Sequence, residues 1–233
     1  MNPALVAVAA ADLTLADLPS PLPLAALVPG PAGAEGAGAP SGSPWEVEIG
    51  FGKGRYLLSR CLASPERRFL GLEVASEYHR RFVGRARRRG LANWAALRGD
   101  ALYLAAAVLP AGFAAAVHVY FPDPWPKSRH QKRRLFDPET VDLVLGLLQP
   151  GGRLCFATDF LAYGERVAEL LAGSPGLAVE RRGAWEEGPR TNYEAKYEAA
   201  GRPILRLEAT LTGPPALHPQ GAAAVLGPLR LAV

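Results

Sequence analysis

A carboxylate, an indole ring and a dense run of cations lie within one short segment of this chain, residues 121–134. The segment follows an apolar run, 114–120, that is typical of a buried strand. Prolines at every second position restrict the residue before each of them, so Phe121, Asp123 and Trp125 are expected to be extended. Five of the last eight residues of the segment are Lys or Arg. An acid, a flat ring and phosphate-binding cations on one stiff loop suggest chemistry on a nucleic-acid base.

The elements that must position this loop alternate along the chain between short apolar runs and longer amphipathic ones. Such alternation predicts an α/β fold with a parallel sheet covered by helices on both faces. Asp137 as cap and Pro138 at the first position mark the start of one helix, and the Pro-Gly-Gly at 150–152 marks its end. No clear helix separates the last two strands, which favours an antiparallel ending. The expected strands are 45–49, 69–73, 94–97, 114–120, 153–158, 177–181 and 205–211. The expected helices are 54–63, 76–89, 101–109, 138–148 and 161–172.

Acidic residues fall at the ends of five consecutive expected strands. Glu48 lies in the first strand, Glu73 closes the second and Asp100 follows the third. Asp123 and Asp159 follow the fourth and fifth. In open α/β sheets, ligands bind outside the carboxyl ends of the strands. The five acids therefore mark the expected ligand-binding edge.

A glycine segment after the first strand indicates the kind of ligand. Gly50, Gly52 and Gly54 give a GxGxG spacing, whereas a dinucleotide site of a dehydrogenase requires GxGxxG. A crevice lined with carboxylates would repel phosphates and attract a cationic nucleoside such as S-adenosylmethionine. Glu73 has the spacing expected of an acid that reaches ribose hydroxyls. A glycine turn flanked by solvated acids is the alternative.

Composition limits the class of protein. The chain has 233 residues, of which 49% are hydrophobic, and no apolar run approaches the ~20 residues that span a membrane. Residues 1–40 carry a net charge of −3 and the rest of the chain +7, which suits a polyanionic partner. We expect an Ala/Pro/Gly-rich extension at 1–43, one domain at 44–212 and a tail at 213–233. Two cysteines and no secretory pattern suggest the cytoplasm and no metal site.

Six motifs together resemble one known family, the bacterial tRNA (guanine-N7)-methyltransferases, and the resemblance runs from about Trp45 to Thr210. The loop at 122–134 and the late motif at 191–194 are specific to this family, whereas many methyltransferases share the glycine turn. The motifs are Glu-Ile-Gly-Phe-Gly-Lys-Gly at 48–54, Gly-Leu-Glu-Val at 71–74, Arg-Gly-Asp-Ala at 98–101, the loop at 122–134, Ala-Thr-Asp at 157–159 and Thr-Asn-Tyr-Glu at 191–194.

The resemblance implies a class I (Rossmann-like) S-adenosylmethionine-dependent methyltransferase with a mostly parallel seven-stranded sheet and an antiparallel last strand. It implies methyl transfer to N7 of guanine 46 in the variable loop of tRNA. Asp123 would be the catalytic residue. The cofactor-binding residues would be Glu48, Gly50, Gly52, Glu73, Asp100 and Asp123. The substrate-binding residues would be Lys127, Asp159, Thr191, Asn192, Tyr193 and Glu194, and the RNA contacts Arg129, His130, Lys132, Arg133 and Arg134.

Several alternatives stay open at this level. Trp125 either stacks on a base or anchors its own loop, and the arginines at 80–89 either contact tRNA phosphates or form a solvated helix face. Thr191 and Glu194 also fit a helix start, and His118 fits a satisfied core histidine. The same fold could methylate another RNA or a small molecule, or bind RNA without catalysis. Monomer and homodimer are not distinguished.

Overall fold

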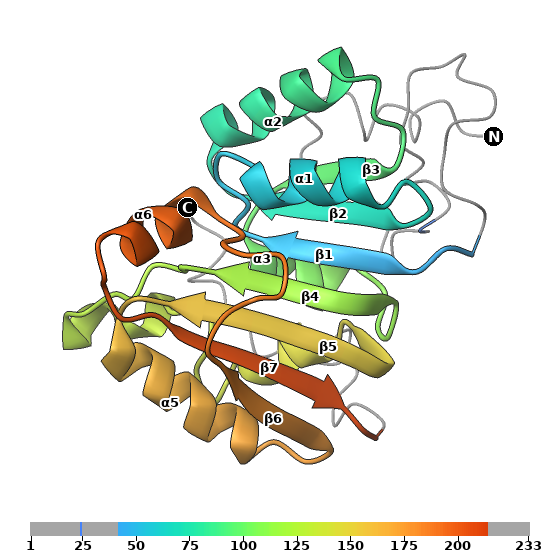
Figure 1. Ribbon diagram of the computed structural model, residues 1–233. Helices are drawn as coiled ribbons and strands as arrows, with labels where there is room; N and C mark the ends of the chain where they lie inside the picture. Colours follow the sequence, from blue (N-terminus) through green and yellow to red (C-terminus); the bar gives the residue numbers. More distant parts are fainter. Residues whose placement is uncertain (1–23, 25–41, 214–233) are drawn as a thin grey trace.

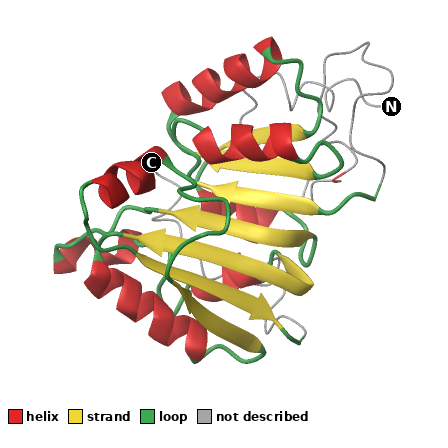
Figure 2. Cartoon of the chain, viewed as in Figure 1, coloured by secondary structure: helices red, strands yellow, loops and turns green. Residues whose placement is uncertain are grey.

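Seven strands form one sheet in the computed structural model, which describes Leu24 and residues 42–213. The strand order is β3-β2-β1-β4-β5-β7-β6, and only β7 runs opposite to the others (Figure 2). The expected mostly parallel sheet with an antiparallel last strand is thereby confirmed. The strands are β1 (Trp45–Ile49), β2 (Arg68–Glu73), β3 (Trp94–Arg98), β4 (Ala114–Tyr120), β5 (Leu148–Thr158), β6 (Leu177–Arg182) and β7 (Leu205–Leu211).

Helices connect the strands and cover both faces of the sheet, and buried apolar clusters lie on each face. Phe51, Leu57, Phe82 and Trp94 pack together where α1 and α2 cover β1 to β3 (Figure 1). A larger core lies on the other face, between the strands and η3, α4 and α5. The helices are α1 (Arg55–Ala63), α2 (Ser76–Arg88), α3 (Ala101–Tyr103) continuing as the π-helix η3 (Leu104–Val108), the 3-10 helix η4 (Ser128–Arg133), α4 (Val141–Leu145), α5 (Leu161–Ala172) and α6 (Asn192–Ala199).

Strand β4 shows how alternation serves both faces. Val117 and Val119 enter the larger core, while His118 and Tyr120 point to the face covered by α1. Successive side chains of a strand point to opposite faces, which explains this division. Polar side chains of β4 therefore lie on the α1 face of the sheet, up to the last residue of the strand, Tyr120.

Three expectations about local structure were wrong. The helix expected at 138–148 spans only Val141–Leu145, because residues 138–140 form a turn, closed by Thr140 N donating to Asp137 O at 3.1 Å, and β5 already begins at Leu148. Asp137 caps that turn and accepts hydrogen bonds from Glu139 N at 2.9 Å and Thr140 Oγ1 at 3.0 Å. The Pro-Gly-Gly at 150–152 lies inside β5, where the pairing with β4 is irregular. A bulge accommodates a proline within a strand. Helix α6 lies between β6 and β7, where no clear helix was expected and a helix start at Thr191 was only an alternative interpretation.

The expected extension at 1–43 and tail at 213–233 lie almost wholly outside the described residues, so those boundaries stay expectations. Within the described part of the chain, every helix is too short or too polar to cross a lipid bilayer.

Candidate active site

The acids expected at the strand ends lie along one edge of the sheet. β1 pairs in parallel with β2 and β4, β2 with β3, and β4 with β5, so their carboxyl ends face the same way (Figure 1). Glu48 is buried in β1, and Glu73 is the last residue of β2. Asp100 caps α3 by accepting a hydrogen bond from Tyr103 N at 2.9 Å. Asp123 and Asp159 follow β4 and β5.

The glycine turn is joined to Glu73. Gly50 and Gly52 both have a left-handed backbone, with φ of 72° and 50°, which glycine adopts without steric cost. The Glu73 carboxylate accepts hydrogen bonds from Gly52 N at 2.7 Å and from Ala75 N at 2.9 Å. Each carboxylate oxygen can accept a further bond. Glu73 is therefore held in place with acceptor capacity left for a ligand such as a ribose.

Glu48 carries an unsatisfied oxygen in a buried position. Its side chain is almost fully buried, and among the described residues nothing donates to Oε2. Burial raises the pKa of Glu48 to about 8, with a smaller contribution in the same direction from Glu73, while His118 opposes the rise. A buried, unpaired acceptor is costly, and a ligand cation would relieve that cost. The ammonium group of S-adenosylmethionine fits this requirement.

The loop after β4 leaves the strand through a strained residue. The backbone of Phe121 has φ of 53° and that of Trp125 has φ of 39°, so the expected extended conformation was wrong for both. Phe121 N donates to Ala157 O at 2.7 Å and fixes this bend against β5. Left-handed non-glycine residues typically cost ~1–3 kcal/mol and cluster at functional sites. Asp123, two residues later, is exposed.

Arg134 supports the loop from beneath, and the expectation that it contacts RNA does not fit its position. It is 7% exposed and donates to Pro124 O at 2.8 Å and to Trp125 O at 3.4 Å. Its guanidinium also lies 5.0 Å from the ring centroid of Tyr163. The carbonyl groups of a proline-rich loop have no partners from regular secondary structure, and Arg134 donates hydrogen bonds to two of these carbonyl groups.

The basic end of the loop folds over Trp125. The His130 ring lies edge-on to it, with centroids 5.6 Å apart, and the Arg133 guanidinium lies 5.0 Å from its centroid. These contacts favour Trp125 as an anchor of its own loop. Lys127, Arg129 and Arg133 are exposed. The side chain of Lys132 lies outside the described part of the structure.

The late motif at 191–194 begins α6, as the alternative interpretation had it. Thr191 Oγ1 accepts a hydrogen bond from Glu194 N at 3.0 Å, which is an N-cap. Glu194 is fully buried, and it accepts hydrogen bonds from Arg206 Nε and from Arg190 N, both at 2.7 Å. Its carboxylate thus holds the helix and does not face a substrate, contrary to expectation. Asn192 and Tyr193 are exposed.

Asp159 has a cationic partner at the same edge, since Arg202 Nη2 lies 3.1 Å from its carboxylate. Arg55, on the first turn of α1, donates to Thr191 O and to Asn192 Oδ1, both at 3.4 Å. These contacts tie α6 to the cofactor side of the site.

Sequence reasoning missed Arg190. Its guanidinium lies 4.1 Å from the ring centroid of Trp185 and donates to Tyr120 Oη at 2.6 Å. It thereby links the start of α6 to the last residue of β4. The partners are 5 and 70 residues away in sequence, and no spacing rule connects them; its position next to Thr191 was the only available signal.

His118 is a satisfied core histidine, as expected. It is buried and lies within hydrogen-bonding distance of Glu46, Tyr56 and Tyr120. Burial opposes its protonation, but contacts with Cys155 and Glu46 raise the pKa of His118 to about 9. The same contact with His118 holds the pKa of Glu46 well below its usual range despite burial. These contacts of His118 join β1, α1 and β4 on the α1 face of the sheet.

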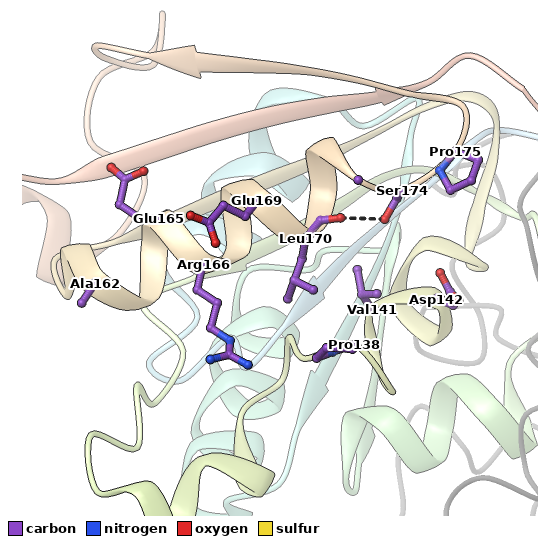
Figure 3. A pocket seen from close by; sticks show the side chains of 11 residues that line it. Pro138, Val141, Asp142, Ala162, Glu165, Arg166, Glu169, Leu170, Ser174 and Pro175 are labelled. Atoms are coloured by element: carbon purple, nitrogen blue, oxygen red, sulfur yellow. Dashed lines mark hydrogen bonds between the residues drawn. The ribbon is translucent and has the colours of Figure 1, made fainter.

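A groove of about 720 Å³ lies elsewhere, along α5 and the start of α4 (Figure 3). It is lined by Val141, Arg166, Glu169 and Leu170 among others, and no predicted site residue lines it. Within the described residues, no group of three or more His, Cys, Asp or Glu is arranged to hold a metal ion.

Comparisons with known proteins identify the family of this chain. A family model described as "Putative methyltransferase" matches residues 43–207. A tRNA (guanine-N(7)-)-methyltransferase of Nitrosococcus oceani is 38% identical over 162 residues, 69% of each chain. One of Chromohalobacter salexigens is 40% identical over 172 residues, 71% of this chain and 70% of the relative.

Among solved structures, the 16S rRNA methyltransferase KamB superposes with a TM-score of 0.53 over 73% of this chain and 89% of that chain, at 16% identity. This likeness supports the fold, which is that of S-adenosylmethionine-dependent methyltransferases. The matched range includes the acids, the glycine turn and the proline loop. The chain therefore belongs to the tRNA (guanine-N7)-methyltransferase family.

Proposed function

We propose that this protein acts in the cytoplasm and methylates N7 of guanine 46 in the variable loop of tRNA. The observation that carries the proposal is the junction after β4, where Asp123 on the acid-lined edge is followed within ten residues by exposed Lys127, Arg129 and Arg133. Cationic S-adenosylmethionine and polyanionic tRNA can both bind at this junction.

Glu48, Glu73 and Asp100 would bind S-adenosylmethionine, with Gly50 and Gly52 allowing its close approach. The unsatisfied Glu48 Oε2 supports an ammonium contact, and the fixed carboxylate of Glu73 supports a ribose contact. S-adenosylmethionine supplies a methyl group that is made electrophilic by its sulfonium. These residues hold and orient it, which is the main contribution needed for a displacement.

Guanine N7 has an in-plane lone pair and no proton, so it attacks in line without a general base. The new N–C bond forms as the S–C bond breaks, and the electron pair of the broken bond stays on sulfur. Positive charge arises on the guanine ring in this step. Asp123, exposed beside the bend at Phe121, would stabilise that charge and orient the base. Lys127, Asp159, Asn192 and Tyr193 would contact the substrate.

The test is methyl transfer from radiolabelled S-adenosylmethionine to an unmodified tRNA transcript. Cleavage chemistry selective for N7-methylguanine should place the label at position 46, and a transcript with adenosine at 46 should stay unlabelled. Label on another atom or another nucleotide would refute the proposal.

Asp123→Asn tests the catalytic role. We expect kcat/KM to fall by ~10²–10³-fold, the range seen when one electrostatic group of an active site is removed, with the tRNA dissociation constant unchanged. Glu169→Gln, an exposed acid in the groove of Figure 3, is the matched control and should retain full activity. Full activity of Asp123→Asn would overturn the assignment.

A further inference from the structure

We propose that the rings of Tyr193, Tyr197 and Phe121 form a stacking platform for the acceptor purine base. This inference rests on the proposed function, because it identifies where the base of that reaction binds. The ring centroid of Tyr193 lies 6.2 Å from that of Phe121 and 6.1 Å from that of Tyr197. The centroids of Phe121 and Tyr197 are 5.7 Å apart. Each ring therefore contacts the other two.

Tyr193 is the open member of the platform. Its side chain is 59% exposed, although it packs against two rings. Among the described residues, Phe160 is the other large apolar side chain with an exposed aromatic ring, and it is 37% exposed. A ring supported on one side and open on the other offers a π-face, which any base can use for stacking.

The platform is rigid before any ligand arrives. Phe121 is fixed by its bond to Ala157 O, and Tyr197 by the Arg202 guanidinium 4.3 Å from its ring centroid. The helix that carries both tyrosines is held by Thr191 at its cap and by the buried Glu194 carboxylate. Stacking on a prepared surface avoids the entropy cost of ordering side chains.

The platform lies between the two expected ligands. Phe121 is two residues from Asp123, and Arg55 joins the start of α6 to the helix that follows the glycine turn. Helix α6 lies at the carboxyl edge of β1 and β4 (Figure 1). A base on Tyr193 would thus be next to the acid edge.

Two features select a nucleic-acid base as the occupant over an apolar protein segment. The loop that begins at Phe121 continues into exposed Lys127, Arg129 and Arg133, which suit phosphates. A guanine ring also becomes cationic on N7 methylation, and the negative face of an aromatic ring attracts a cation. The platform would stabilise the base as its charge develops.

The experiment uses a tRNA with 2-aminopurine at position 46, whose fluorescence is quenched when the base stacks on an aromatic ring. We expect wild-type protein and Tyr193→Phe to quench the probe, and Tyr193→Leu, which keeps apolar bulk, to leave it bright. With unmodified tRNA, kcat/KM of Tyr193→Leu should fall about 5- to 150-fold, the range that base–aromatic stacking gives. Affinity for S-adenosylmethionine should not change. Leu62→Ala, at an apolar side chain of similar exposure on α1, is the control.

A probe that stays unquenched in the wild-type complex overturns the platform, whatever the activity. Equal kcat/KM of Tyr193→Leu and wild type also overturns it. If the probe is quenched but no methyl group is transferred, the platform stands and the proposed function fails, so the two failures are distinguishable.

Discussion

Removal of the Glu194 carboxylate should destabilise the fold more than it weakens substrate binding. Glu194 is fully buried and Arg206 is 5% exposed, and the two are joined at 2.7 Å. Loss of one partner of a buried ion pair typically costs ~3–5 kcal/mol, because the remaining charge is left uncompensated. Arg206 retains contacts with Glu198 and Gly183 O, so we take the lower end, about 3 kcal/mol.

For a chain of this size, about 3 kcal/mol corresponds to a fall in Tm of ~6–12 °C for Glu194→Ala, measured by scanning calorimetry. Glu165→Ala breaks an exposed ion pair with Arg181 and should melt close to wild type. The double variant with Glu194→Leu and Arg206→Met removes both charges and should recover much of the loss.

A loss of substrate binding without a loss of stability would refute this reasoning. If Glu194→Ala melts within ~2 °C of wild type while its KM for tRNA rises, the carboxylate contacts the substrate as the family motif implied. A double variant less stable than Glu194→Ala would show that the pair does not act as one unit.

Three further results are expected. Burial raises the pKa of Glu48 from 4.5 to about 8, so between these pH values the native state holds a proton that the unfolded chain has lost, and the free energy of unfolding falls as pH rises. Glu48→Gln should therefore stabilise the protein more at pH 8 than at pH 5 in urea titrations, and an equal gain at both would contradict the shift. Gly71→Ala should cost ~1–3 kcal/mol, because its Cβ would lie 2.6 Å from Leu57 Cδ2; a Tm unchanged in calorimetry would show that the neighbours yield. Replacing Arg129 and Arg133 with Ala should reduce the log–log salt slope of tRNA binding by ~0.7–0.9 per lost phosphate contact, and an unchanged slope would mean that both are merely solvated.

The regular elements followed from hydrophobic periodicity. The strands at 114–120 and 205–211 and the helix at 161–172 have the expected bounds, since each has a continuous pattern and a clear turn on both sides. The alignment of the acids also followed, because parallel strands bring their carboxyl ends to one edge.

What sequence reasoning could not provide depends on partners distant along the chain. Arg134 was grouped with its exposed neighbours, yet it lies over Tyr163, 29 residues away. Glu194 belonged to a substrate motif but pairs with Arg206 on β7. The left-handed bend at Phe121 contradicts a local rule about residues before proline, and its bond to Ala157 O on β5 compensates. Local patterns contain no information about such tertiary partners.

The hydrogen bond from Arg190 to Tyr120 Oη bears on how a mutation can impair the site. It joins the segment just before α6, the helix that bears Tyr193 and Tyr197, to the last residue of β4, three residues before Asp123. In the proposed site this hydrogen bond, together with the contacts of Arg55 and Phe121, would keep the acceptor base and the methyl donor in alignment without contacting either ligand. Loss of this hydrogen bond would lower kcat and leave the dissociation constants of both ligands unchanged. Affinity measurements alone would therefore not detect the defect, which is one of alignment.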